Sequence, residues 1–200
     1  GTLLLYLDSD GVVAPGWLDA MLEADDGGTV LLGCAMDYGR ERVQRVPRRA
    51  TFLGKSLPCR PDRANTGPSC NLGVPRRCFD ALNGFDEELR HFEDSDFCIR
   101  AARAGFAFRY LPCAIFCHKG SDIARGPAVE NKEHYSTYAM LKAYQCKPLH
   151  LLAFSLGNGL WLAVRLVYWP FQGRMAECRL LVRGWRTAYV RFWRRHSLRR

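Results

Sequence analysis

The sequence has no C-x-x-C pair among its nine cysteines. Zinc ribbons and redox motifs usually carry that spacing, and an odd number of scattered cysteines does not form a disulfide framework. We therefore expect reduced, mostly buried thiols of a cytosolic protein. Cys113, Cys117 and His118 are the one group that suggests zinc, but on an alternating strand we expect the two cysteines to be packing residues.

Acidic residues are scarce at the C-terminal end. Residues 174–200 contain nine arginines and one acid, Glu177, and this net +8 accounts for almost all of the formal charge of +9. The rest of the chain is nearly neutral and contains no recognised nucleic-acid module, so we expect no nucleic-acid partner. A basic end after an apolar stretch favours anionic lipid headgroups instead.

An uninterrupted run of about 20 apolar residues is also missing. The most apolar stretch, residues 149–171, is broken by His150, Asn158 and Arg165. Interfacial or re-entrant association with a membrane fits this pattern better than a crossing helix, and a helical hairpin packed on the domain fits it equally well. Residues 174–200 predict a basic amphipathic helix whose apolar stripe is formed by Leu181, Trp185, Ala188, Tyr189 and Phe192.

What is present is typical of a globular chain. Its 200 residues are enough for one domain with a core, and 48% hydrophobic and 24% charged residues are typical of globular proteins. The sequence contains no internal repeat. Residues 2–7 already read as a buried strand with no methionine before them, so we expect that the chain begins inside a longer protein.

The first candidate site follows that strand directly. Asp8-Ser9-Asp10-Gly11 lies at its carboxyl end, where open α/β sheets place their ligands. Two carboxylates one residue apart suit a hard divalent cation that bridges a diphosphate, and Gly11 allows a close approach of the backbone. Two solvated turn aspartates are the structural alternative.

Further elements follow from periodicity and turn residues. Pro15 predicts the start of a helix with Trp17, Leu18, Met21 and Leu22 buried. Residues 37–64 are basic and irregular, either a solvated loop or a segment that closes over a donor or receives an anionic acceptor. The other expected elements are strands at 29–36, 106–110 and 112–117, a turn entering a strand at 65–74, and helices at 76–82 and 131–146.

The second candidate site is the acidic start of a helix within residues 83–105. Phe97, Cys98 and Ala101 fall on one side of this helix. One acid in a first turn is explained by the helix end, at about 0.3–1 kcal/mol. Glu93, Asp94 and Asp96 together repel one another, which favours a cation, a cationic partner or proton transfer.

The same residues resemble a known family. The segment NGFDE…EDSDF…R…G of residues 83–105 resembles the GGFDE…EDxDL…R…G signature of family 2 glycosyltransferases, which have the GT-A fold. Asn71-Leu72-Gly73-Val74, with Arg76 or Arg77, resembles the acceptor-side segment before that signature. Asp8 and Asp10 resemble the DxD motif, and His118 falls where similar enzymes have an H-x-G-S histidine that completes the metal site.

The resemblance implies an α/β fold with a GT-A mixed sheet flanked by helices, truncated at the N-terminus and extended by helices at the C-terminus. Residues 1–147 would be the metal and acceptor half of the domain, and residues 148–200 an apolar, then basic, membrane-interfacial region. The implied location is cytoplasmic and peripheral, at the inner face of the cell membrane.

The implied activity is inverting transfer of a sugar from a nucleotide-diphospho-sugar to an acceptor hydroxyl, in cell-envelope or polysaccharide synthesis. The acceptor would be a glycan or a lipid-linked molecule. Asp8, Asp10 and His118 would hold Mn²⁺ or Mg²⁺ at the donor diphosphate. Asp94 would be the general base, with Glu93 as the alternative, and Asp96 would cap the helix or orient Arg100.

Two other interpretations stay open. Residues 5–13 resemble the hhhDxDG motif of haloacid-dehalogenase-type phosphatases, with Asp8 as nucleophile and Asp10 as acid/base. Against this, the later acids do not follow an apolar strand, as the acidic metal-binding motif of that family does. The third interpretation is a non-catalytic, membrane-associated fragment.

Overall fold

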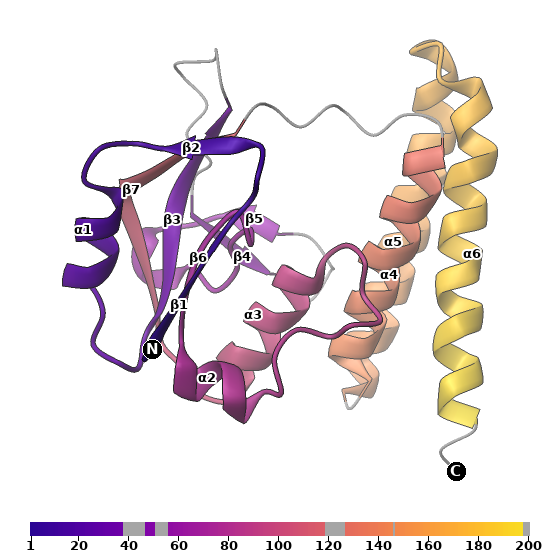
Figure 1. The fold of residues 1–200 in the computed structure, drawn as a ribbon. Helices are drawn as coiled ribbons and strands as arrows, with labels where there is room; N and C mark the ends of the chain where they lie inside the picture. Colours follow the sequence, from indigo (N-terminus) through magenta and orange to yellow (C-terminus); the bar gives the residue numbers. More distant parts are fainter. Residues whose placement is uncertain (38–46, 51–55, 119–126, 146, 198–200) are drawn as a thin grey trace. The chain divides into compact units, whose positions relative to one another are not determined.

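The computed structural model describes residues 1–37, 47–50, 56–118, 127–145 and 147–197 (Figure 1). Contacts between residues divide the chain into two compact units. The sheet unit comprises Gly1–Ala50, Ser56–Asp86 and Asp94–Asp122, and the helical unit comprises Thr51–Lys55, Glu87–Glu93 and Ile123–Arg200. This division differs from the boundary expected after residue 147, because the helix before that residue belongs to the helical unit.

A five-stranded mixed sheet forms the sheet unit, in the order β1-β6-β3-β7-β2. Its strands are β1 (Leu3–Leu7), β2 (Gly11–Val13), β3 (Val30–Asp37), β6 (Asn71–Pro75) and β7 (Phe108–His118). Strand β6 is antiparallel to β1 and β3, and β3 is parallel to β7. The carboxyl ends of β1, β3 and β7 therefore meet at one edge, and the α/β class with a mixed sheet is as the sequence predicted.

Helices cover both faces of this sheet. Helix α1 (Trp17–Glu23) packs through Trp17 and Met21 against Leu31, while α2 (Arg76–Ala81) and α3 (Glu93–Arg103) cover the opposite face. Alternation along β3 explains the two cores, since Leu31 points to one face and Val30 and Leu32 to the other.

The burial predicted for α1 is partly wrong. Leu18 and Leu22 are 50% and 53% exposed, whereas Trp17 and Met21 are buried. Helix α1 has only seven residues, so a narrow face suffices to contact the sheet.

Strand β7 replaces the two strands expected at 106–110 and 112–117. Its pairing with β3 steps from Gly33↔Leu111 to Cys34↔Ile115, so residues 112–114 bulge out of the ladder. Pro112 has no N–H to give to a neighbouring strand, and a bulge lets the strand continue past it.

The basic segment contains a small second sheet. It consists of β4 (Arg48–Ala50) and β5 (Ser56–Pro58), followed by the 3₁₀ turn η1 (Pro61–Arg63). Arg40, Arg42, Arg45 and Lys55, which the sequence analysis placed in this segment, lie outside the described residues.

Three long helices form most of the helical unit: α4 (Pro127–Tyr144), α5 (Pro148–Phe171) and α6 (Met175–Ser197). Among the described residues, α5 is a helix long and apolar enough to cross a membrane by length and composition, so the interruptions in its sequence do not break it. The apolar stripe expected on α6 faces the interior of the helical unit. Leu181, Ala188 and Phe192 are each at most 2% exposed.

Candidate functional site

The Asp8–Asp10 turn lies at the edge of the sheet where the parallel strands end. It joins β1 to β2, and both aspartates are exposed. At Gly11 a β-carbon would lie 2.2 Å from the ring of Phe116, so only glycine allows β2 to approach β7 this closely. Gly11 is the register partner of His118, which places the backbone of His118 beside the acidic turn.

The chemistry of this turn suits a hard cation only in part. Asp8 and Asp10 offer the carboxylate oxygens that Mg²⁺ and Mn²⁺ prefer. Among the side chains that the structure describes, no group of three or more His, Cys, Asp or Glu residues is arranged to hold a metal. The side chain of His118 lies outside that set.

Asp94 reaches the same edge from α3. Its carboxylate accepts hydrogen bonds from the backbone N–H groups of Ser95, at 2.6 Å, and Ser69, at 3.2 Å. Ser69 precedes β6, whose first residue, Asn71, pairs with Leu7 at the end of β1. The pairing of β1 with β6 therefore places Asp94 near Asp8, which follows Leu7 in the chain.

A cavity of about 170 Å³ lies at Asp94. Polar groups from different elements line this cavity. Among the described lining residues Asp94 is the only carboxylate, and Glu93 does not line the cavity. The polar lining residues are Arg48, Thr66, Asp94, Ser95 and Tyr110. The volume is below the about 300–1,000 Å³ that encloses a drug-sized ligand, so the cavity fits one end of a larger molecule.

Burial raises the pKa of Asp94 above its ordinary value. The two backbone hydrogen bonds oppose this rise, and the negative charge of Asp8 adds to it. Desolvation is therefore the main cause of the raised pKa, and the like charge that adds to it comes from Asp8 instead of from the acids next to Asp94 in sequence.

Asp96 has a structural role, two residues away. It is 2% exposed and holds Arg100 through an ion pair of 2.7 Å. Arg100 also donates to the carbonyl oxygens of Leu82, at 2.9 Å, and Gly84, at 3.0 Å. Asp96 thus orients Arg100, one of its two expected roles, and Arg100 fixes the turn before α3.

Asn71 is a structural residue that the sequence analysis placed on the acceptor side. Its side chain is fully buried and accepts a hydrogen bond from Trp17 Nε1 at 2.8 Å. Its amide nitrogen donates to the carbonyl oxygens of Cys34, at 3.0 Å, and Ala114, at 2.8 Å. Asn71 therefore bridges the bulge between β3 and β7. Only the polarity of an asparagine at the start of an apolar strand hinted at this in the sequence.

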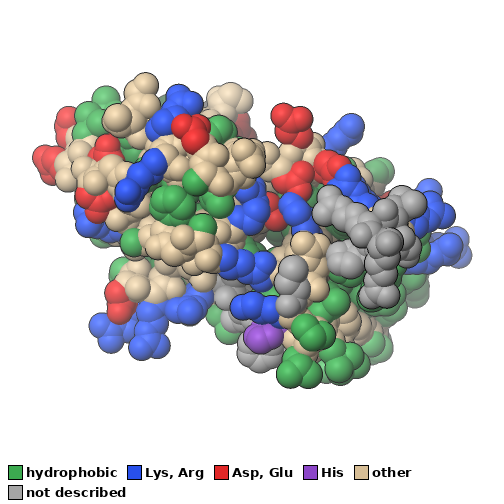
Figure 2. All heavy atoms as spheres, turned by 90° about the horizontal axis from the view of Figure 1, so that it is seen from below, with side chains coloured by type: hydrophobic (Ala, Val, Ile, Leu, Met, Phe, Trp, Pro, Cys, Tyr) green, Lys and Arg blue, Asp and Glu red, His purple; other side chains and the backbone are tan. Residues whose placement is uncertain are grey.

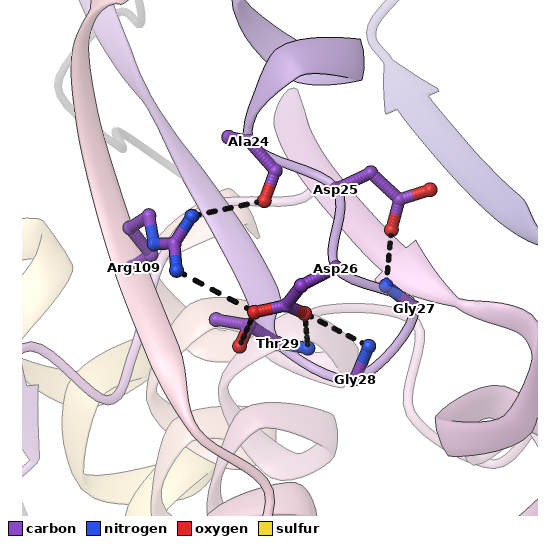
Figure 3. A network of polar contacts seen from close by, with 7 residues as sticks. All are labelled: Ala24, Asp25, Asp26, Gly27, Gly28, Thr29 and Arg109. Atoms are coloured by element: carbon purple, nitrogen blue, oxygen red, sulfur yellow. Dashed lines mark hydrogen bonds and ion pairs between the residues drawn. The ribbon is translucent and has the colours of Figure 1, made fainter.

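A second acidic turn joins α1 to the amino end of β3, at the edge of the sheet opposite Asp8 and Asp10. Figure 3 shows its polar contacts. Asp26 accepts hydrogen bonds from the N–H groups of Gly28 and Thr29 and from the Thr29 hydroxyl, at 2.8–2.9 Å. These bonds, helped by Arg109, lower the pKa of Asp26 to about 2. Both oxygens of Asp26 are occupied by the turn itself, so we interpret it as structural.

The cysteines follow the expected pattern only in part, since four of the eight that the structure describes are buried. Cys34, Cys70, Cys78 and Cys98 are buried free thiols, and burial raises the pKa of Cys98 to about 12, which keeps it unreactive. Cys113 is exposed, contrary to the packing role predicted for it, because it lies in the bulge of β7.

Comparison with known proteins gives one solved structure to report. It is the mannosyltransferase PcManGT from Pyrobaculum calidifontis in complex with GDP-Man and Mn²⁺, with 12% sequence identity and a TM-score of 0.48. The alignment covers 92% of this chain and 61% of that one. No protein-family model and no curated protein sequence matches the chain.

Proposed function

We propose that the sheet unit is the metal and acceptor half of a glycosyltransferase that uses a nucleotide-diphospho-sugar. The observation that supports this most is Asp94, a carboxylate of raised pKa that lines a cavity and lies within electrostatic reach of Asp8. The acids begin α3 and do not follow an apolar strand, which also disfavours the phosphatase alternative.

Asp94 would act as the general base. In transfer to a hydroxyl, the base removes the acceptor proton as the oxygen attacks the anomeric carbon. A carboxylate whose pKa is raised toward neutrality binds that proton more readily, provided that it is ionised in the resting state. Among the described residues that line the cavity Asp94 is the one carboxylate, and a single general base next to the acceptor suits direct displacement with inversion.

Asp8 and Asp10 would hold the divalent cation, with His118 as a further ligand. A cation there supplies charge stabilisation for the departing diphosphate. The two aspartates are exposed at the edge where the parallel strands end, the usual ligand edge of such sheets.

Arg48 and the small cavity would receive the acceptor. Arg48 comes from the basic segment and lines the cavity together with Asp94. Its guanidinium suits an anionic or hydroxyl-rich acceptor end next to the base. A glycan or a lipid-linked sugar fits this chemistry.

The test is calorimetric titration of the full-length protein with Mn²⁺ and a panel of nucleoside diphosphates, with transfer activity measured in parallel. Asp10→Ala should abolish metal-dependent nucleotide binding. Asp94→Asn should keep that binding and lower the rate of sugar transfer at least 100-fold. A general base typically contributes about 10²–10⁴-fold to the rate. Asp25→Asn, in the turn at the opposite edge, is the matched control and should change neither.

Two outcomes would overturn the proposal. One is the absence of binding to every nucleotide with and without metal. The other is an Asp94→Asn variant that transfers sugar at the wild-type rate.

A further inference from the structure

Helix α5 presents a continuous apolar stripe to its surroundings. The stripe recurs every three or four residues along the whole helix, and each of its members is at least 47% exposed. Its members are Leu149, Leu152, Leu156, Leu160, Val164, Val167 and Phe171. At 1.5 Å per residue the stripe is about 33 Å long. A run of this length without a polar member is unusual on a surface that faces water.

The polar residues of α5 lie on its other side and are paired within the helical unit. Arg165 donates to Glu133 of α4 at 2.7 Å, and Glu133 is 6% exposed. Asn158 donates to Thr137 of α4 at 3.2 Å. The residues that interrupt the apolar sequence therefore hold α5 on α4, and this orientation leaves only apolar side chains in the stripe.

Helix α6 supplies basic charge to the same unit. Six arginines of α6 gather on one surface of this helix: Arg179, Arg183, Arg186, Arg191, Arg194 and Arg195. Acids neutralise part of this charge, since Glu88 pairs with Arg191 and Arg195, and Glu130 pairs with Arg183. No acid within the described ranges pairs with Arg179, Arg186 or Arg194.

The two features occur together on the helical unit. Helices α5 and α6 pack on each other through Leu162 and Leu181, and Figure 2 shows green hydrophobic and blue basic side chains on the face that it views. Exposed Val190 and Trp193 also lie among the arginines of α6. An apolar face next to unneutralised arginines is complementary to a lipid surface with negative headgroups.

We propose that the helical unit docks on an anionic lipid bilayer, with α5 lying in the plane of the membrane and its stripe in contact with the acyl chains. The inward stripe of α6 is not the contact, because Leu181, Ala188 and Phe192 are buried in the unit. This inference is independent of the proposed transfer activity, since it uses no residue of the sheet unit.

The in-plane position follows from the neighbours of α5. The exposed stripe lies on one side of α5, and the helix packs on the other side against α4 and α6, where Leu162 is buried. Arginines are exposed along α6 at Arg179, Arg183, Arg186 and Arg194. Moving these charges through a hydrocarbon layer is costly, so the unit contacts the bilayer from one side.

The test is co-sedimentation of the full-length protein with vesicles of pure phosphatidylcholine or of phosphatidylcholine with 30% phosphatidylglycerol. Wild type should bind the anionic vesicles at least tenfold more tightly than the neutral ones. Leu156→Ser combined with Leu160→Ser should reduce binding at least tenfold, and Arg186→Gln combined with Arg194→Gln should reduce the preference for anionic lipid.

The matched control is Leu18→Ser combined with Leu22→Ser, two exposed leucines on α1 of the sheet unit. This variant should bind as wild type does, and circular dichroism should show equal helix content in all variants. Extraction by alkaline carbonate should release the bound protein, as expected for a peripheral contact.

Three results would overturn the proposal. The first is unchanged vesicle binding by the Leu156 and Leu160 variant. The second is a wild-type dimer in sedimentation velocity that the same variant dissociates, because a second copy would then cover the stripe. The third is carbonate-resistant binding, which would indicate a crossing helix.

Discussion

The side-chain amide of Asn71 occupies the space in which a β-carbon on Gly33 would lie, 2.2 Å from its atoms. Gly33 is the last residue of β3 before the register shift, and Asn71 bonds to carbonyl oxygens on both sides of that shift. The absent side chain on one strand and the buried amide on the next therefore form one structural feature, which holds the long strand β7 in the sheet.

Gly33→Ala should destabilise the sheet unit by about 1–3 kcal/mol, the usual cost of overpacking a core, because Asn71 would be displaced from its partners. Chemical unfolding followed by tryptophan fluorescence measures this. Gly159→Ala is the control, since no atom lies within 4 Å of a β-carbon there and alanine favours the helix by about 0.5–1 kcal/mol. Equal stability of the two variants would contradict the role given to Asn71.

Arg100→Lys should destabilise the sheet unit by about 1–3 kcal/mol. A lysine cannot reproduce the planar guanidinium that bonds to Asp96, Leu82 and Gly84 together. Arg103→Lys, on the exposed side of the same helix, should stay within about 0.5 kcal/mol of wild type. Thermal unfolding of the two variants tests this prediction. An equal loss of stability in both would contradict the role given to the Arg100 hydrogen bonds.

Asp94→Asn should become more stable relative to wild type as pH rises. The pKa of Asp94 in the folded chain is raised above that of an unfolded aspartate, about 3.9. The ionised carboxylate therefore lowers the free energy of unfolding, by an amount that is absent below the unfolded pKa and complete above the folded one. The measurement is the free energy of unfolding of both proteins from about pH 3.5, near that reference pKa, to about pH 7. A difference in stability that stayed constant over this range would show that Asp94 is not desolvated.

Asp26 should behave in the opposite way. Its pKa is lowered to about 2, mainly by the Thr29 hydroxyl, so the ionised form stabilises the folded chain above the unfolded pKa. Asp26→Asn should therefore be less stable than wild type at neutral pH, and the difference should vanish as pH falls through about 2. Melting temperatures across that range test this, with Asp25→Asn as the control for removing a charge from the turn.

Glu133→Ala should destabilise the helical unit by about 3–5 kcal/mol, because it leaves the charge of Arg165 without its buried partner. Glu133→Leu combined with Arg165→Met should recover most of that loss, since two apolar side chains replace the pair. A double-mutant cycle of Glu133→Leu, Arg165→Met and their combination, measured by chemical unfolding, gives the interaction directly. If the two single substitutions simply add, the ion pair does not hold α5 on α4.

The sequence by itself determined the kind and order of most of the longer elements, but not the short strands β2, β4 and β5 or the single strand β7. Apolar alternation and turn residues gave β3 and α2 nearly at their observed bounds, and the acidic start of α3 was visible from Glu93 to Asp96. These features depend on neighbours a few residues away, and backbone preferences act over that range. The position of Asp8 and Asp10 after the first strand was predictable for the same reason.

Only the tertiary structure decided which residues are structural and which line the site. Asp94 and Asp96 are two residues apart, yet one borders a cavity and the other is buried against Arg100. Asn71 is a buried bridge, and the stripe of α6 faces the core while that of α5 faces outward. Burial and long-range partners set these roles, because the free energy of a polar or apolar side chain depends on what surrounds it in space.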